Sequence, residues 1–348
     1  MKRKKVTIED IARHLDCSVS TVSRALNDKP GISEKVKTEI RITALDMGYV
    51  IKNIKNVKKT AKSNKSGEVK CISMIVTRAN FTDEDFYRNI ICEIEQVIYK
   101  LNIEVNFFII DRNGNDDIIS RLQRLKPDGA IVFGLLSNQS VTDVVFSGIP
   151  MVLVDIPDIH LMVDRITVNN YLGCYDAVTY LIRQGHKRIA FLGDISFSDN
   201  MVERYRGCKD CVEKNGGIWI EASGIVKFEM TGDVAINEKA LGNLMFSQNP
   251  PTAVVCAYDK TAFKLYEILK KMNITVPDDV SVIGFDNIEK CNYVSPPLTS
   301  VNVPKFEMGQ ESVRMLLERI ANKEKATGLL TLDTNLVIRE SVKINKTR

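Results

Sequence analysis

The chain has 348 residues, of which 44% are hydrophobic, and its formal net charge at pH 7 is +4. This length exceeds one typical domain and suffices for a substantial buried core. No stretch approaches the roughly 18 consecutive apolar residues of a membrane span, and no apolar run follows the basic start as in a secretory signal. The eight cysteines are scattered, as in proteins of a reducing compartment. We therefore expect a cytoplasmic protein that does not contact a membrane.

The basic residues are concentrated at the N-terminal end. Residues 1–66 contain sixteen Lys or Arg and seven Asp or Glu, so the rest of the chain carries a formal net charge of −5. A basic segment joined to an acidic body is typical of a protein that contacts nucleic acid with one end. A merely soluble surface explains single lysines but not this segregation.

The first predicted helix begins after Thr7. Asp10 lies three residues further on, which is the spacing of a capping box that defines a helix start. Apolar residues then follow at the spacing of one helix face: Ile8, Ile11, Ala12 and Leu15.

A second predicted helix follows a tight turn at Asp16 and Cys17. Ser18 can cap it by accepting hydrogen bonds from its first backbone N–H groups. Val22 and Leu26 fall on the side that packs inward. The side chains left to face outward are Ser20, Thr21, Ser23 and Arg24. Two helices joined in this way form the unit that many proteins insert into the major groove of DNA.

A third predicted helix closes a small three-helix core. Ser33 is its predicted cap, and it ends near Gly48. Its apolar face consists of Ile32, Val36, Ile40 and Ala44. The alternative is an ordinary three-helix domain whose polar face is only solvated.

Three motifs in this region strongly resemble the headpiece of the lactose/galactose repressor family of bacterial transcription regulators. They are Val6-Thr-Ile with Asp10-Ile-Ala, the run from Ser18 to Asn27, and Gly48-Tyr49. The resemblance implies that Val19, Ser20 and Arg24 approach base edges, and Arg can bind guanine through two hydrogen bonds. It implies that the other DNA-binding residues hold phosphates or support docking: Thr7, Ser18, Thr21, Ser23, Asn27 and Tyr49.

Two positions depart from the family pattern. Asp16 replaces the usual turn glycine, and Asp tolerates a left-handed backbone better than most residues. Lys58 replaces the leucine that the family's hinge helix wedges into the minor groove. Since lysine cannot unstack a base step as an apolar wedge does, we expect phosphate contacts without a strong kink. A register shift that uses Val57 or Ile54 as the wedge is the alternative.

The composition divides the chain into three parts. We expect a helix-turn-helix domain at residues 1–52 and an effector-binding and dimerisation core at residues 70–348. Residues 53–69 between them are rich in Lys, Asn and Ser, which is typical of a mobile basic linker or hinge.

The core alternates short β-rich runs with helical patterns. The predicted strands are Cys71–Thr77, Glu104–Ile110, Gly129–Phe133, Met151–Asp155, Arg188–Leu192, Thr252–Ala257 and Val280–Gly284. The predicted helices are Phe86–Tyr99, Tyr171–Gln184, Met201–Lys214 and Phe263–Lys271. This alternation favours an α/β fold with parallel sheets in two lobes, with a ligand cleft between them at the carboxyl ends of the strands.

The core also resembles the sugar-binding core of the same family, which is similar to periplasmic solute-binding proteins. The matching motifs are Gly185-His, Arg204-Tyr-Arg-Gly207, Ala257-Tyr-Asp259, Val282-Ile-Gly-Phe-Asp286, and Pro297-Leu-Thr-Ser-Val301 with Pro304. The resemblance implies that Arg204 and Asp286 bind the effector, with Asp155 as a weaker third contact. Phe86 and Tyr87 match an aromatic pair of the same site, and Phe228 or Trp219 could supply a stacking face.

Each of these residues also has a structural interpretation. Arg204 could be a surface ion-pair partner, and Phe86 could simply be part of the core. Tyr258 stands where several sugar-responsive relatives have asparagine, which leaves the identity of the effector open.

No pattern of catalytic residues stands out. The chain lacks a G-x-x-x-x-G-K-[ST] loop, an H-E-x-x-H motif and a G-x-S-x-G elbow. Cys208 and Cys211 form a C-x-x-C pattern, but they lie in a helical segment without a second pair, so we expect no metal site. We therefore expect neither an enzyme nor a cofactor.

The sequence thus predicts a DNA-binding transcription regulator, a repressor, that binds a near-palindromic operator as a homodimer. A small ligand, a sugar or sugar derivative, would switch it. Regulation by a phosphorylated carrier protein with a vestigial cleft, and a transport-type solute-binding protein, are the alternatives.

Overall fold

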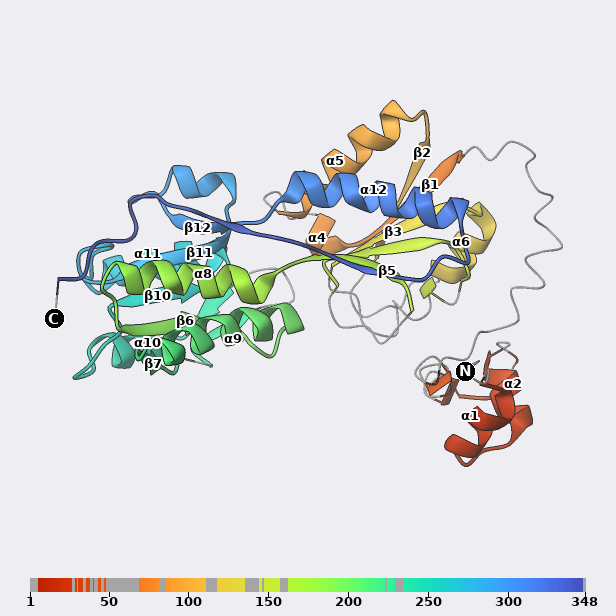
Figure 1. The fold of residues 1–348 in the computed structure, drawn as a ribbon, viewed down its shortest axis with the longest axis horizontal. Helices are drawn as coiled ribbons and strands as arrows, with labels where there is room; N and C mark the ends of the chain where they lie inside the picture. Colours follow the sequence, from red (N-terminus) through yellow and green to blue (C-terminus); the bar gives the residue numbers. More distant parts are fainter. Residues whose placement is uncertain are drawn as a thin grey trace. The chain divides into compact units, whose positions relative to one another are not determined.

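The computed structural model in Figure 1 forms two compact units. It describes residues 6–26, 29, 31–33, 36–37, 40, 43–44, 47, 69–81, 86–110, 118–134, 144–145, 147–156, 162–222, 224–228 and 234–346. The first unit contains Met1–Thr77, Val97–Arg165 and Ser312–Leu329. The second unit contains Arg78–Gln96, Ile166–Glu311 and Leu330–Arg348. Each unit is therefore assembled from three separate segments of the chain.

The N-terminal helices have their own small core. Helix α1 (Ile8–His14) and helix α2 (Val19–Leu26) are joined by a short turn, as predicted. The buried residues of this core are Ile11, Ala12, Val22, Ala25, Leu26, Ile40 and Ala44. Ser33 accepts a hydrogen bond from the Val36 N–H at 3.4 Å, which supports its predicted role as a cap. The prediction that Val36 packs inward is wrong, because its side chain is 38% exposed.

One six-stranded sheet has the order β13-β5-β4-β3-β1-β2. Its strands are β1 (Cys71–Thr77), β2 (Glu104–Ile110), β3 (Gly129–Phe133), β4 (Met151–Val154), β5 (Asp164–Val168) and β13 (Leu329–Leu332). Strand β1 pairs in parallel with both β2 and β3, and β3 pairs in parallel with β4. Every residue of β3 and β4 is buried, as expected for parallel strands that are covered on both faces.

A second six-stranded sheet has the order β14-β12-β11-β10-β6-β7. Its strands are β6 (Arg188–Leu192), β7 (Ile218–Ile220), β10 (Ala253–Cys256), β11 (Ser281–Asp286), β12 (Thr299–Asn302) and β14 (Asn335–Val337). All of its pairs are parallel except that between β12 and β14. Strands β8 (Val226–Phe228) and β9 (Val234–Ile236) form a separate antiparallel pair.

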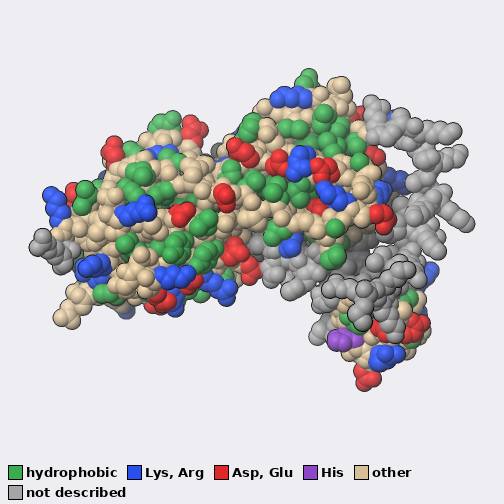
Figure 2. Space-filling model, in the orientation of Figure 1, with side chains coloured by type: hydrophobic (Ala, Val, Ile, Leu, Met, Phe, Trp, Pro, Cys, Tyr) green, Lys and Arg blue, Asp and Glu red, His purple; other side chains and the backbone are tan. Residues whose placement is uncertain are grey.

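Helices flank both sheets (Figure 1). They are α4 (Arg78–Phe81), α5 (Tyr87–Lys100), α6 (Ile118–Leu125), α8 (Asn170–Arg183), α9 (Asp199–Lys214), α10 (Glu238–Met245), α11 (Asp259–Lys271) and α12 (Lys305–Ala321), with a 3-10 helix η2 (Glu289–Asn292). Within the described ranges, no helix is long and apolar enough to cross a membrane. On the face drawn in Figure 2, acidic and basic side chains are interspersed over the sheet-containing parts.

The predicted α/β fold with parallel sheets is confirmed. Four of the seven predicted strands have the predicted bounds. Strand β4 ends one residue earlier, β10 is one residue shorter at each end, and β11 begins one residue later and continues to Asp286. Seven strands were not predicted, because they have only three to five residues and no long apolar run: β5, β7, β8, β9, β12, β13 and β14. The four residues of β13, for example, are all at least partly exposed.

Helices α8 and α9 pack side by side in the second unit. Gly207 of α9 makes this possible, because a Cβ atom there would lie 2.2 Å from the carbonyl oxygen of Tyr171 in α8. The glycine of the Arg204-Tyr-Arg-Gly207 motif is thus explained by backbone packing.

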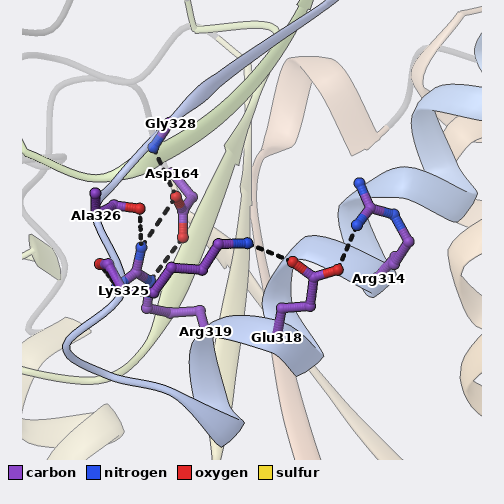
Figure 3. Close-up of polar contacts among 7 residues, drawn as sticks. All are labelled: Asp164, Arg314, Glu318, Arg319, Lys325, Ala326 and Gly328. Carbon is purple, nitrogen blue, oxygen red and sulfur yellow. Dashed lines mark hydrogen bonds and ion pairs between the residues drawn. The ribbon is translucent and has the colours of Figure 1, made fainter.

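A buried ion pair closes the end of α12 in the first unit (Figure 3). Arg319 donates from Nε and Nη2 to the Asp164 carboxylate at 2.7 and 3.2 Å. It also donates to the carbonyl oxygens of Lys323, Lys325 and Ala326, while the Gly328 N–H donates to Asp164. The pair therefore binds three carbonyl oxygens and one N–H group of the turn between α12 and β13.

Replacing Arg319 should destabilise the protein strongly. Arg319→Met leaves the Asp164 carboxylate buried without its cation, so we expect the unfolding free energy to fall by about 3–5 kcal/mol in urea denaturation. Arg314→Met is the matched control, because Arg314 pairs with Glu318 on the exposed side of the same helix (Figure 3). Equal losses in the two variants would contradict the assigned role of Arg319.

Candidate functional site

The start of α1 is held by the predicted capping box. The Asp10 N–H donates to the Thr7 hydroxyl oxygen at 3.3 Å, and the Thr7 N–H donates to the Asp10 carboxylate at 3.0 Å. Asp16 has a φ of +48°, which is the left-handed conformation expected at the turn position. The turn that places α2 therefore forms with Asp in place of glycine.

Ser18 caps α2 as predicted. Its Oγ accepts from the Thr21 N–H at 3.0 Å and lies within hydrogen-bond distance of the hydroxyls of Ser20 and Thr21, at 2.7 and 2.8 Å. Three hydroxyl groups are thus gathered at the N-terminus of one helix. Backbone N–H groups and hydroxyls at a helix start are suited to phosphate oxygens.

The outward face of α2 contains the residues predicted to approach base edges. Val19 is 44% exposed, and Ser20 and Arg24 are exposed as well. At 100° per residue, the arc from Val19 to Arg24 spans about 140° of the helix and includes the half-buried Ser23. Thr21 is also half-buried, and Asn27 and Tyr49 lie outside the described residues.

The second group of predicted residues lies at the carboxyl end of β11. Asp286 ends this strand with a φ of +107°, a backbone conformation that residues with a side chain rarely adopt. Such a conformation costs on the order of 1 kcal/mol or more, so surrounding contacts must hold it. Arg204 of α9 is almost fully buried, which contradicts its interpretation as a surface ion-pair partner.

The guanidinium of Arg204 is fixed on several sides. Its Nε donates to Asn170 Oδ1 at 2.8 Å, and Nη1 donates to the Ala257 carbonyl oxygen at 2.6 Å. Its Cζ lies 3.6 Å from the ring centroid of Phe285 and 5.0 Å from that of Tyr258. Asn170 is itself fully buried and held by hydrogen bonds to Val168 and Asn200. The orientation of the charge is therefore set before any ligand binds.

Arg204 and Asp286 are close without a direct hydrogen bond. Arg204 Nη2 lies 3.8 Å from Asp286 Oδ1, longer than a charge-assisted hydrogen bond. Arginine only donates and an ionised carboxylate only accepts. A ligand hydroxyl can do both, so this pair of side chains is suited to a polyol.

The turn after Asp286 is anchored by Asp259 and Ser300, which were not among the predicted site residues. Asp259 accepts from the Ile288 N–H at 2.9 Å and from the Ser300 hydroxyl at 2.6 Å. Ser300 in turn accepts from the Asn287 N–H at 3.0 Å. Asp259 belongs to the family motif Ala257-Tyr-Asp259 and follows a predicted strand, so the sequence could have indicated it as a site residue.

A cation completes this turn. Lys305, the first residue of α12, donates from Nζ to the carbonyl oxygen of Asp286. Burial lowers the pKa of the Lys305 ammonium, while the carboxylates of Asp286 and Asp259 favour its charged form. Lys305 is the third residue after the end of β12, and because this strand was not predicted, no signal in the sequence marked Lys305.

The other predicted effector contacts have different surroundings. Phe86 and Tyr87 are both buried, and their rings meet edge to face at 4.9 Å. Asp155, which follows β4 with a φ of +58°, belongs to the first unit. Trp219 packs edge to face on Tyr205 at 5.3 Å.

The remaining candidates from the sequence are Phe228 and the two cysteines of the C-x-x-C pattern. The side chain of Phe228 lies outside the part that the structure describes. Cys208 and Cys211 are fully buried in α9, and none of the eight cysteines, all of them described, forms a disulfide. Among the described residues, no group of three or more His, Cys, Asp or Glu side chains could hold a metal ion.

Asp259 should give the protein a distinctive pH dependence. Burial raises the pKa of its carboxyl from 3.8 to about 6, although the hydrogen bonds from Ser300 and Ile288 oppose this shift. The folded chain thus holds a proton here that the unfolded chain has released. This contribution to stability is fully present below pH 3.8 and is lost as the pH rises through about 6.

The prediction concerns Asp259→Asn, in which the amide imitates the protonated carboxyl. Between pH 4.5 and 7.0, the unfolding free energy of the wild type should fall by about 2 kcal/mol relative to the variant, as measured by urea denaturation. Asp279→Asn is the control, because hydrogen bonds from Thr275 lower the pKa of Asp279 and it exchanges no proton in this range. Parallel curves for Asp259→Asn and the wild type would refute the assignment.

Comparison with known proteins places both sites in context. Residues 7–59 match the family described as bacterial regulatory proteins, lacI family, and residues 178–342 match the periplasmic binding protein-like domain. The first match contains α1 and α2, and the second contains Arg204 and Asp286.

Relatives are similar over nearly the whole chain. The HTH-type transcriptional repressor PurR of Photobacterium profundum is 29% identical, and the match covers 97% of this chain and 98% of that protein. The ribose operon repressor of Haemophilus influenzae is 28% identical with the same coverage. These are transcriptional repressors, not enzymes.

A solved structure agrees with these matches. The lacI-family transcriptional regulator of Enterococcus faecium with bound ribose is 26% identical, with a TM-score of 0.67, and the match covers 79% of this chain and 100% of that one. Together, the helix-turn-helix, the parallel sheets and these matches show that the chain combines a lacI-family helix-turn-helix region with a periplasmic-binding-protein-like core, as the resemblance to the lactose/galactose repressor family implied.

Proposed function

We propose that this protein is a transcriptional repressor that binds a near-palindromic operator as a homodimer and is switched by ribose or a similar sugar. The Arg204–Asp286 pair carries this proposal, because it combines a fixed donor and an acceptor 3.8 Å apart at the end of β11. A chain that binds operator DNA acts where the bacterial chromosome is, in the cytoplasm.

The helix-turn-helix of α1 and α2, called the head below, is suited to one half-site of an operator. The exposed face of α2 presents Val19, Ser20 and Arg24, while the hydroxyls around Ser18 lie at the helix start. This arrangement allows base contacts by the face and phosphate contacts by the end. Two such heads in a homodimer would bind two half-sites related by symmetry.

Arg24 should determine sequence preference. Arg24→Ala is expected to lower the affinity for a selected genomic operator at least tenfold, because a bidentate contact to guanine is worth about 1–3 kcal/mol. Binding to random DNA should change little. The measurement is fluorescence anisotropy with both duplexes at two salt concentrations. If affinity falls equally on random DNA, Arg24 contacts only phosphate.

The chemistry of the Arg204–Asp286 pair favours a sugar. Each hydroxyl of a sugar can accept from Arg204 and donate to Asp286, and the aromatic rings of Tyr258 and Phe285 adjoin the guanidinium. Ribose is the first probe to choose, since a structural neighbour binds it and a relative is a ribose operon repressor. Effector and operator must then influence each other reciprocally, with a coupling of about 1–3 kcal/mol.

Asp286→Asn tests this site while keeping a residue that tolerates positive φ. Ribose should raise the melting temperature of the wild-type protein, and the substitution should weaken ribose binding at least tenfold, because a hydrogen bond to a charged group is lost. Operator affinity without ribose should stay the same. Asp278→Asn, an exposed aspartate just before β11, is the matched control. A wild-type protein that neither binds nor responds to ribose, while another compound in the screen stabilises it, would refute the choice of ribose.

A further inference from the structure

Lys305 of α12 contacts the end of β11 and the residue before α5. It is the first residue of α12, and its ammonium donates to the Asp286 carbonyl oxygen at the end of β11. The same ammonium lies 5.7 Å from the ring centroid of Phe86, the residue immediately before α5. Lys305 therefore connects the Asp286 carbonyl oxygen with the start of α12 and lies beside the start of α5.

The carbonyl that Lys305 binds belongs to a strained segment. Asp286 and Asn287 both have positive φ values, +107° and +49°. The next two backbone N–H groups are bound by Ser300 and Asp259, which lie in the strand and helix adjoining β11. Lys305 binds the Asp286 carbonyl oxygen and so connects this segment with α12. A change at Asp286 can thus move α12 through Lys305, because a buried charge does not readily lose its partner.

The starts of α5 and α12 are tightly joined to each other. Gln310 of α12 donates from Nε2 to Glu93 Oε1 of α5 at 3.1 Å, and Glu93 is buried. A Cβ atom on Gly309 would lie 2.9 Å from Glu93 Cβ, which leaves no room for anything larger than glycine. A displacement of the α12 start is therefore transmitted to α5.

Both helices continue into the other unit. Residues up to Gln96 of α5 and Glu311 of α12 belong to the second unit, and the remaining residues of each helix belong to the first. The first unit also contains the segment Met1–Thr77 with its helix-turn-helix. Each of the two helices therefore has residues in both units.

We propose that Lys305 is a positioning residue that transmits effector occupancy of the Arg204–Asp286 pair to α5 and α12. The inference rests on the proposed effector function. A ligand hydroxyl held by the Asp286 side chain changes the position of its backbone carbonyl, and the Lys305 ammonium follows that oxygen. Lys305 thereby determines the response to the effector rather than its affinity.

The test compares full-length wild type with Lys305→Met, which keeps the chain length and removes the charge. Ribose affinity is measured by calorimetry, and operator affinity is measured by anisotropy with and without ribose. We expect ribose affinity to stay within about threefold, while the operator response falls from about tenfold to less than twofold. Lys290→Met is the matched control, because Lys290 also lies over a phenylalanine ring, at 4.9 Å, but that ring belongs to Phe263.

Each other outcome has a defined meaning. A full operator response in Lys305→Met would overturn the proposal. Loss of ribose binding in that variant would also overturn it, since Lys305 would then be a ligand contact. If the wild type does not respond to ribose, the choice of effector fails, and hydrogen exchange without ligand decides on Lys305. Faster exchange in the first turns of α5 and α12 of Lys305→Met, but not of Lys290→Met, supports its positioning role, and unchanged exchange overturns it.

Discussion

The buried guanidinium of Arg204 is the constraint on which much of the second unit depends. A cation taken out of water must be compensated, and three elements contribute to this. Helix α8 supplies Asn170, the end of β10 supplies the Ala257 carbonyl, and β11 supplies Phe285 and Asp286. The Arg204 charge therefore fixes the start of α8 and the ends of β10 and β11 relative to one another.

In the head, the polar groups available to a ligand are hydroxyls, and they are held in a different way from Arg204. Its hydroxyls are engaged with one another and with backbone N–H groups rather than with a buried charge. Such contacts are weak and exposed, so a phosphate can replace them at little cost. In the proposed function, DNA would be recognised through replaceable contacts, whereas a small ligand would be recognised by a rigid, desolvated pair.

Local chemistry explains which features could be predicted from the sequence. The caps at Thr7 and Ser18, the turn at Asp16 and the central strands follow from neighbouring residues and from periodicity. Arg204 and Asp286 were singled out through family motifs, and they lie close together within the second unit, while their role in binding an effector stays a prediction. Asn170 and Lys305 could not be identified, because their roles arise from contacts 34 and 19 residues away in the chain. The short strands escaped prediction for the related reason that pairing with a distant strand, not local propensity, forms them.

The Arg319–Asp164 pair has a consequence for the order in which the protein folds during synthesis. Its two partners are 155 residues apart, and the first unit needs the segment Ser312–Leu329 near the end of the chain. Domains usually fold as units while the ribosome extends the chain. The small N-terminal core contains all its partners within the first 47 residues and can fold early. The sheet of the first unit, in contrast, has to wait until almost the whole protein has been made.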